Sequence, residues 1–351
     1  MRIIVDAMSG DNAPLEIIKG VALAKEECKE DTFVLVGKED VIRQIAGEIS
    51  LDLTDIDIVN SDVVITMEDD PISVVRAKKD SSMSVALGLL ADGKGDACVS
   101  AGNTGALFTG ASLIVRKMKG ILRPAIATVL PFTPPVILLD SGANLVVSEE
   151  NLEQFACMGS SYMKKMHGVE NPRVGLLNNG EEKTKGLELQ LSSYDKLSAC
   201  EDINFVGNIE ANRLMKNTCD VIVTDGFTGN IMLKTIEGMG KMALGVLKDI
   251  FYKNELTKVA ALIVKKPLYA VKKNFDPAEH GGAPILGVSK PVIKAHGSSK
   301  AKAFKNAILQ AKRYVSSGVT EDIARDAMEF AAKRKAEKAA AKAEASAEVN
   351  E

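Results

Sequence analysis

A repeated order of short apolar segment, glycine-containing polar turn and helical segment limits the folds that this chain can adopt. In the clearest copy, residues 221–223 are apolar, a glycine-rich turn starts at Asp225, and helical spacing begins at Ile231. Short, continuously apolar strands that alternate with helices are typical of a mainly parallel sheet covered on both faces. The sequence therefore predicts an α/β fold, a three-layer αβα sandwich, and its 351 residues are enough for a single large domain over residues 1–330.

Several of the predicted strands end in polar turns that contain glycine. The turns begin at Asp6, Ser100, Asp140, Asn178 and Asp225. Ligands of open α/β sheets bind outside the carboxyl ends of the strands. A helix that follows such a turn also presents free backbone N–H groups and the positive end of its dipole. We expect these turns to line one anion-binding crevice, whereas any single turn can equally serve only to join a strand to a helix.

The composition argues against several classes of protein. A formal net charge of -3 and a pI near 5.9 predict no nucleic acid partner. The five cysteines form no C-x-x-C motif, and residues 2–5 are a strand-like segment in place of a basic secretory leader. No apolar stretch approaches the ~20 residues that a membrane-spanning helix needs. The expected location is cytoplasmic.

Motifs for several kinds of catalysis are missing from the sequence. It has no Walker loop, no H-E-x-x-H motif, no G-x-S-x-G elbow, and no G-x-G-x-x-G directly after a strand. The histidines His167, His280 and His296 stand alone, so no metal site is expected. Cys98, on a predicted strand before a turn, can be an acyl-carrying thiol, although a buried structural cysteine is commoner at such a position.

Three lysines lie near predicted helix starts beside the polar turns: Lys185, Lys234 and Lys300. Because histidine-based acid–base catalysis is poorly supplied, the residues suit a reaction with an anionic nucleophile and a good leaving group. Phosphate attack on a thioester is such a reaction, since the enzyme mainly positions the phosphate and stabilises the oxyanion of the tetrahedral intermediate.

Two segments after the core differ in composition from the rest. Residues 251–273, within an amphipathic excursion over about 247–275, are rich in lysine and include Leu262, Ile263, Lys265 and Lys266. Such a stretch can lie on an anionic membrane surface, or it can form a helical pair at a subunit interface. Residues 331–351 are a low-complexity Ala/Lys/Glu run, which we interpret as a frayed helix or a disordered tail.

Eight sequence blocks in a fixed order carry a resemblance to a known family. They are DAMSGDNAP (6–14), SAGNTGA (100–106), RPAI (123–126), LLDSGAN (138–144), GLLNNGEEKTKG (175–186), FVGNIE (205–210), DGFTGNIMLK (225–234) and GGAPILG (281–287). Together they closely resemble the bacterial phosphate acyltransferases, which make acyl phosphate from acyl-acyl carrier protein. The resemblance covers about residues 1–330.

The resemblance implies that long-chain acyl-acyl carrier protein and inorganic phosphate are converted to acyl phosphate and free acyl carrier protein. The product would then feed a glycerol-3-phosphate acyltransferase downstream, in phospholipid synthesis. The resemblance also implies a homodimer with no organic cofactor, attached peripherally to the inner face of the membrane through a hydrophobic tip. The implied fold is similar to phosphotransacetylase and isopropylmalate dehydrogenase.

The family motifs, matched to this sequence, indicate candidate site residues. Lys185 would hold phosphate or the developing oxyanion as a fixed positive charge, and Asn230 would donate a hydrogen bond to the same group. Further candidates for binding substrate or orienting the loops are Asp6, Asn103, Arg123, Asn144, Asn178 and Asp225. Two places depart from the family pattern: Ser9 stands for a usual glycine, and residues 211–213 (Ala-Asn-Arg) stand for Gly-Arg-Asp.

Two other functions remain open from the sequence. A phosphotransacetylase-type enzyme that uses a short acyl-coenzyme A would have a short acyl pocket and no membrane tip. A non-catalytic membrane scaffold for acyl carrier protein would use the lysine-rich excursion and not the glycine turns.

Overall fold

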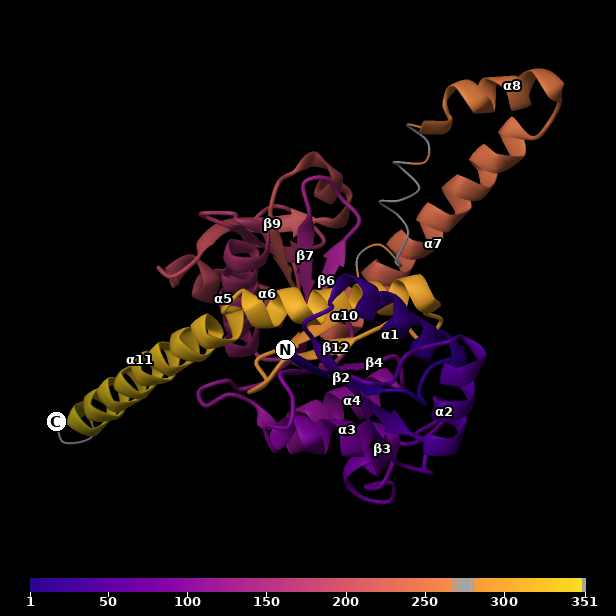
Figure 1. Cartoon of the computed structure of the whole chain (residues 1–351). Helices are drawn as coiled ribbons and strands as arrows, with labels where there is room; N and C mark the ends of the chain where they lie inside the picture. The colour runs from indigo at the N-terminus through magenta and orange to yellow at the C-terminus, as the bar shows by residue number, and fades with distance from the viewer. Residues whose placement is uncertain (267–268, 270–278, 280, 349–351) are drawn as a thin grey trace.

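The computed structural model describes residues 1–266, 269, 279 and 281–348, with side chains described up to residue 336. Within these residues the chain forms two β-sheets with helices packed around them (Figure 1). Helical segments project from this body at two places. One is the pair α7 (Gly226–Phe251) and α8 (Glu255–Ile263), and the other is the end of α11 (Val319–Glu348).

The first sheet joins the N-terminal strands to strands from near the C-terminus. Its spatial order is β3 (Ile56–Asn60), β2 (Thr32–Gly37), β1 (Arg2–Asp6), β4 (Ala97–Ser100), β12 (Val292–Lys294), β11 (Ala283–Leu286) and β5 (Ala125–Ile126). The strands from β3 to β12 pair in parallel, and β11 runs antiparallel to both of its neighbours. Ile3, Val5 and Leu35 are fully buried, as expected for strands covered on both faces.

The second sheet is formed by the middle of the chain. Its order is β6 (Thr128–Leu130), β7 (Val136–Leu139), β10 (Val221–Val223), β8 (Arg173–Asn178) and β9 (Asn204–Glu210), with β6 antiparallel to β7 and the others parallel. The predicted α/β class and mainly parallel strands are therefore confirmed. The strands divide between two sheets where the sequence analysis expected one, because apolar patterning identifies strands but not their pairing partners. The chain crosses between the sheets at Ala127, whose N–H donates to the carbonyl of Pro284 at 3.0 Å.

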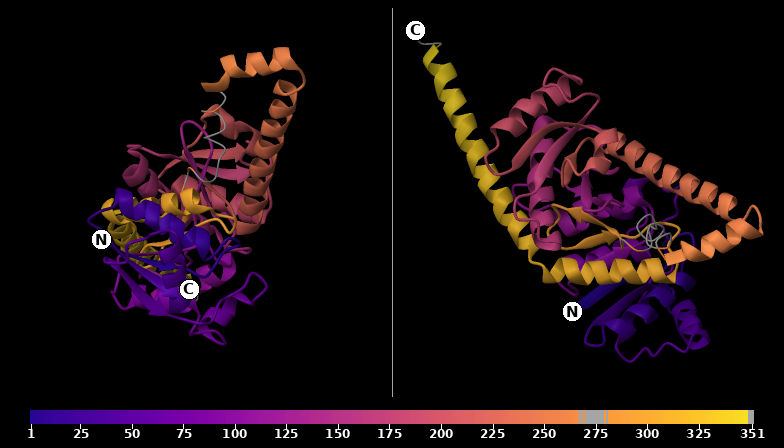
Figure 2. Two further views of the ribbon diagram at one scale, coloured as in Figure 1. Left: turned by 45° about the vertical axis from the view of Figure 1, so that its right-hand side comes forward. Right: turned by 90° about the horizontal axis from the view of Figure 1, so that it is seen from above.

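Helices cover both faces of each sheet (Figures 1 and 2). On the first sheet, α1 (Leu15–Glu27), α2 (Glu39–Glu48) and α10 (Ala301–Ser316) cover one face, and α3 (Ser82–Ala91) and α4 (Thr104–Gly110) cover the other. On the second sheet, α5 (Glu149–His167), α6 (Glu188–Ala199) and the first turns of α11 cover one face. The first turns of α7 pack Met232 against the opposite face.

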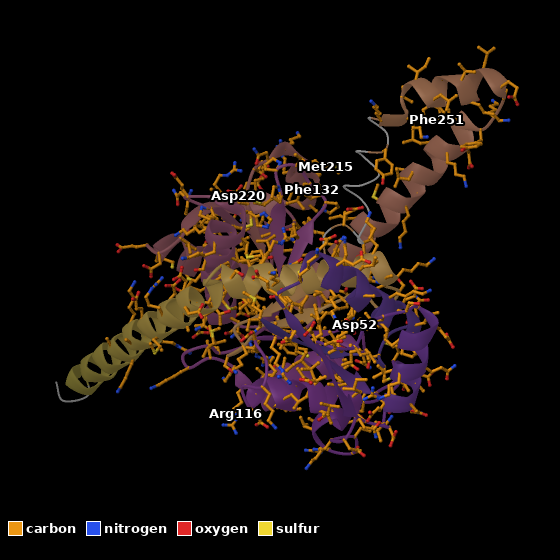
Figure 3. The ribbon with its side chains drawn as sticks, viewed as in Figure 1. Asp52, Arg116, Phe132, Met215, Asp220 and Phe251 are labelled. Atoms are coloured by element: carbon orange, nitrogen blue, oxygen red, sulfur yellow. The ribbon has the colours of Figure 1, made fainter. Side chains whose placement is uncertain are left out.

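The arm, defined here as residues 239–266, corresponds to the first part of the predicted excursion. Every residue of α8 has at least part of its surface exposed, and the side chains of Leu262 and Ile263 are 69% and 78% exposed. Phe251 lies on this arm, whereas Met215 and Phe132 lie on the body (Figure 3). Residues 267–268 and 270–275 of the predicted excursion lie outside the described part of the chain. None of the described helices combines the length and the apolar character needed to cross a membrane.

The C-terminal segment continues as a helix. The sequence left a frayed helix or a disordered tail open for residues 331–351, and the structure extends α11 to Glu348 (Figure 2). Residues 349–351 lie outside the described residues.

Candidate active site

A cavity of about 410 Å³ has walls from both sheets. Three of the predicted turns contribute to the lining. The turn after β4 leads into α4, which begins with the lining residue Thr104, and the turn after β7 contains Gly142. The turn after β10 leads into α7, which carries Asn230. The turn after β1 lies beside the cavity, because the N–H of Asp11 donates to the carbonyl of the lining residue Gly297 at 2.9 Å. The turn after β8 contributes none of the lining residues. The structure thus brings together four of the expected turns.

One end of the cavity is lined by side chains that carry nitrogen donors. They are Asn230 and Lys234 on α7, Lys294 at the end of β12, and His296 just beyond it. The positive charge of Lys234 lowers the pKa of both Lys294 and His296, whereas Glu237, which also lines the cavity, raises that of His296. Among the lining residues, two lysines thus stand against one carboxylate.

Lys294 is a buried cation, with 9% of its surface exposed. Its Nζ donates to the carbonyl of Ala101 at 3.3 Å and to the carbonyl of Ala295. Within the described residues, no carboxylate lies at ion-pair distance from this Nζ. Burial lowers the pKa of Lys294 to about 8, and the more distant Asp11 partly opposes that effect. A buried charge with neither a partner ion nor full hydration costs free energy, so this position calls for an anion.

His296 supplies a neutral donor to the same end. Its Nδ1 accepts the N–H of Ser298 at 3.2 Å and lies 2.9 Å from the Ser298 hydroxyl. With Nδ1 engaged as an acceptor, the neutral ring carries its proton on Nε2. Burial and the positive charge of Lys234 lower the pKa of His296, so the ring is mainly uncharged near neutral pH.

Lys234 lies one helical turn after Asn230 on the same side of α7. Its Nζ pairs with Glu237 at 2.9 Å, and the lysine side chain is 54% exposed. An exposed pair of this kind contributes little free energy, so Lys234 can exchange this partner for a bound anion.

Apolar side chains also line the cavity. They are Ile126 and Val129 at the crossing between the sheets, together with Pro131, Leu233 and Ala283. The cavity therefore offers both cationic and apolar surface to a ligand.

α7 begins earlier than the sequence predicts. The helix begins at Gly226, earlier than the expected Ile231, because the Asp225 side chain caps it by accepting the N–H of Thr228 at 2.8 Å. The N–H of Gly226 donates to the carbonyl of Asn144 at 2.7 Å, and the N–H of Gly229 donates to the carbonyl of Asp225 at 3.0 Å. The backbone donors that were expected to bind an anion are thus largely occupied, and Asp225 is their cap.

Lys185 is not among the residues that line this cavity. It belongs to the turn after β8, and its side chain is exposed. Asn178 shapes that turn, because its Nδ2 donates to the carbonyl of Lys185 at 3.0 Å and its Oδ1 accepts the N–H of Asn179 at 2.8 Å. Asn230 and Lys185 are therefore not brought together within one chain, and Lys300 is likewise absent from the cavity wall.

Asp6 organises the turn after β4 from within the core. It is fully buried, and its carboxylate accepts the hydroxyls of Ser82 and Ser100, each at 2.7 Å. The Ser100 hydroxyl in turn accepts the N–H of Gly102 at 3.1 Å. Burial raises the pKa of Asp6, although these hydrogen bonds oppose the effect. Asp6 acts on the site through its neighbours and does not line the cavity.

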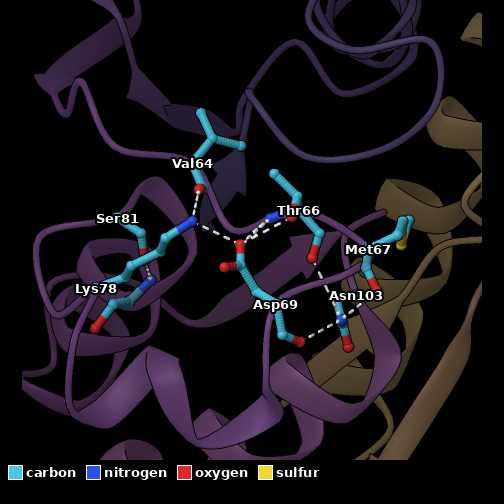
Figure 4. Close-up of polar contacts among 8 residues, drawn as sticks. Val64, Thr66, Met67, Asp69, Lys78, Ser81 and Asn103 are labelled. Atoms are coloured by element: carbon cyan, nitrogen blue, oxygen red, sulfur yellow. Dashed lines mark hydrogen bonds and ion pairs between the residues drawn. The ribbon is translucent and has the colours of Figure 1, made fainter.

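Asn103 has a similar orienting role at the start of α4 (Figure 4). Its Oδ1 accepts the N–H of Ala106 at 3.1 Å, which caps the helix. Its Nδ2 lies within 3.1–3.3 Å of the carbonyls of Thr66, Met67 and Asp69. The segment around Asp69 therefore holds the first residue of α4, Thr104, against the cavity.

Asn144 and Asp140 join the two sheets behind the cavity. Nδ2 of Asn144 donates to the Asp140 carboxylate and to the carbonyl of Pro124, both at 2.8 Å. The same carboxylate accepts the N–H of Ile126 in β5 at 3.1 Å. Arg123, expected as a phosphate ligand, is exposed and lies outside the cavity wall.

The remaining sequence features have structural roles. Cys98 is fully buried, and burial raises the pKa of its thiol far above the usual range, as for a buried structural cysteine. Ser9 is buried and has no positive φ, so its backbone conformation does not require the usual glycine. The departing residues Ala211 and Asn212 are exposed. Among the residues that the structure describes, no group of His, Cys, Asp and Glu side chains has the arrangement of a metal site.

Comparison with known proteins assigns the chain to a family. A family model described as a fatty acid synthesis protein matches residues 1–322. The phosphate acyltransferase of Fusobacterium nucleatum is 45% identical over 331 residues, which are 94% of this chain and 99% of that protein. The phosphate acyltransferase of Clostridioides difficile is 40% identical over 337 residues, which are 95% of this chain and 98% of that protein. The chain belongs to the phosphate acyltransferase family.

Solved structures place this phosphate acyltransferase among known folds. A phosphotransacetylase from Streptococcus pyogenes aligns over 90% of this chain and 94% of its own, with a TM-score of 0.61 and 15% identity. A phosphotransacetylase from Staphylococcus aureus aligns over the same shares with a TM-score of 0.57 and 13% identity. The expected likeness to phosphotransacetylase is confirmed for the fold alone, and the likeness to isopropylmalate dehydrogenase stays a prediction.

Sequence reasoning missed Lys294 and did not give His296 a role. Both residues obey the rule that sites lie at strand ends, because Val292 to Lys294 is a short strand followed by a glycine turn. The rule could not be applied to the sequence, because a strand of three residues that ends in lysine is too short to recognise.

Proposed function

We propose that this phosphate acyltransferase transfers the acyl group of acyl-acyl carrier protein to inorganic phosphate and releases acyl phosphate. The cavity carries the proposal, because its donor-rich end suits phosphate and its apolar wall suits the part of an acyl chain next to the thioester. Walls from both sheets also support one catalytic domain over residues 1–330.

The reaction needs few groups from the protein. A phosphate oxygen attacks the thioester carbonyl carbon, a tetrahedral oxyanion forms, and the carbon–sulfur bond then breaks with departure of the carrier thiolate. Asn230 and the Nε2–H of His296 line the cavity as donors for the oxyanion. Holding both reactants in one cavity supplies the positional part of the rate enhancement.

Trapping of the product tests the proposal. Purified protein is incubated with long-chain acyl-acyl carrier protein, inorganic phosphate and hydroxylamine, and the fatty hydroxamate formed is measured. We expect hydroxamate that depends on both phosphate and protein. Hydroxamate only with acetyl-coenzyme A would favour the phosphotransacetylase-type enzyme, and none with either donor would favour the non-catalytic scaffold.

The arm supports peripheral attachment to the inner face of the membrane. α7 begins at the cavity and continues into the arm, so one helix joins the two (Figure 1). Exposed Leu262 and Ile263 lie near Lys265 and Lys266, a combination suited to an anionic membrane surface. Acyl phosphate formed in the cavity would then be released near the membrane, where a glycerol-3-phosphate acyltransferase consumes it.

A double variant of the arm tests this attachment. Leu262→Glu with Ile263→Glu should abolish co-sedimentation with anionic vesicles and leave catalysis in solution intact. Met215→Glu is the matched control, because Met215 is as exposed as Ile263, at 78%, but lies on the body (Figure 3). Vesicle binding that persists in the double variant would contradict the proposal.

The homodimer belongs to the same proposal. Residues 227–250 expose several large apolar side chains along α7, which a second copy could cover. Light scattering of the wild type and of the double variant separates the two roles of the arm. A dimer that falls apart only in the double variant would assign the arm tip to the subunit interface.

A further inference from the structure

We propose that Lys294 binds the inorganic phosphate substrate and that this phosphate is the counter-ion of the buried ammonium group. The inference rests on the proposed function, and it adds a binding residue to the same cavity. No family motif among the eight blocks of the sequence includes Lys294.

The surroundings of the ammonium group point to an anion. Lys294 lines the cavity, yet nine-tenths of it is buried. Two carbonyls accept its hydrogen bonds, while an ammonium group has three N–H donors. Among the described residues, no carboxylate pairs with it directly. The described residues therefore hold the amine in place and leave part of its charge and donor capacity unused.

Charged groups on β1, in the turn after it and on α7 act on this amine. Glu237, which also lines the cavity, pairs with Lys234. Asp6 on β1 and Asp11 in the following turn favour its charged form, and Lys234 on α7 opposes it. The carboxylate of Asp6 is engaged by two serine hydroxyls, so it does not substitute for a direct partner. A phosphate between Lys294 and Lys234 would relieve the repulsion between the two lysines.

The capped helix starts strengthen the case for a side-chain cation. The first turn of α7 donates its N–H groups to Asp225 and Asn144, and α4 is capped by Asn103. At the start of α7, these bonds leave fewer backbone N–H groups for a phosphate, which increases the need for a side-chain cation. Lys294 lines the same cavity as the side-chain donors Asn230, Lys234 and His296.

A purely structural lysine is the competing explanation. Lys294 could serve only to tie the carbonyl of Ala101 on one strand end to that of Ala295 on the next. In that case its loss would disturb both substrates equally. A phosphate-binding lysine instead affects phosphate alone, and its pKa near 8 predicts a phosphate affinity that falls as the pH rises through this value.

The experiment titrates inorganic phosphate into wild type, Lys294→Met and Lys290→Met by calorimetry, and measures KM for both substrates. Lys290 is the matched control, because it lies just before β12 at the end of the strand away from the cavity. We expect Lys294→Met to weaken phosphate binding and raise the phosphate KM by about tenfold to a hundredfold, the effect of losing a charged hydrogen bond. The KM for acyl-acyl carrier protein should change less than about twofold, and Lys290→Met should match wild type.

Two results would overturn the inference. One is a phosphate affinity of Lys294→Met equal to that of wild type, and the other is an equal loss for both substrates. If this variant does not fold, the wild-type titration still decides, since a phosphate affinity unchanged across pH 8 would contradict the assignment. If the wild type forms hydroxamate and Lys294→Met binds phosphate as the wild type does, only this inference is refuted. If Lys294→Met loses phosphate affinity but the wild type forms no hydroxamate, only the proposed function is refuted.

Discussion

The contact between α7 and the turn after β7 can be tested by replacing glycine with alanine at two positions of one helix. A Cβ at Gly229 would lie well under 3.0 Å from the carbonyl oxygen of Asp140, whereas a Cβ at Gly245 would have nothing within 4 Å. Overpacking costs ~1–3 kcal/mol, and a backbone oxygen cannot rotate away, so we take the upper end. Alanine gains ~1 kcal/mol over glycine in a helix. Gly229→Ala should therefore lose about 2 kcal/mol, and Gly245→Ala should gain up to ~1 kcal/mol.

Urea unfolding followed by circular dichroism measures the difference. The midpoint should fall for Gly229→Ala and hold or rise for Gly245→Ala, with the denaturant slope unchanged in both. Because Asn230 follows Gly229 directly, the displaced helix start should also lower acyl transfer in Gly229→Ala, while Gly245→Ala keeps full activity. Equal stability of the two variants would refute the close packing on which the description of the site depends.

Two further predictions concern residues outside the cavity wall. Lys185→Ala should reduce phosphate-dependent acyl transfer in a protein that remains folded, as the family resemblance implies, and full activity in the hydroxamate assay would remove Lys185 from the mechanism. Asp69→Asn tests the segment that supports Asn103. The hydrogen bonds from Lys78 and Thr66 lower the pKa of Asp69 from 3.8 to about 2. Since the pKa is lower in the folded state, the ionised Asp69 stabilises the fold fully above pH 3.8, and this stabilisation is lost as the pH falls toward 2. Urea midpoints should therefore fall less steeply over this range in Asp69→Asn than in wild type.

The strands could be predicted from the sequence, but their division into sheets could not. Residues 2–5 and 136–139 are continuous apolar runs, and both are buried strands in the structure. The chain leaves one sheet and enters the other at Ala127, a single residue between β5 and β6. Nothing in the apolar pattern around Ala127 distinguishes a change of sheet from a bend within one sheet.

The candidate site was predicted in part for a similar reason. Asp6, Asn103, Asn144 and Asn178 hold the polar turns in place, which is one of the two roles that the sequence allowed them. Lys294 was not found because its significance comes from burial without a carboxylate partner among the described residues, and burial depends on tertiary packing that the sequence pattern does not show.

The glycines of the 225–230 turn illustrate how one sequence pattern can have two physical causes. Glycine-rich turns before helices let a backbone approach an anion closely, which is the role that the sequence predicts for this turn. In the structure, a Cβ at Gly226 would lie 2.8 Å from the backbone nitrogen of Asn144, so glycine is required for the approach of α7 to the turn after β7. This contact places the second turn of α7, with Asn230 and Lys234, at the cavity. The first turn of the helix packs against the turn after β7. The glycines at the start of α7 are therefore explained by packing, and Lys294 is the lining lysine that is buried.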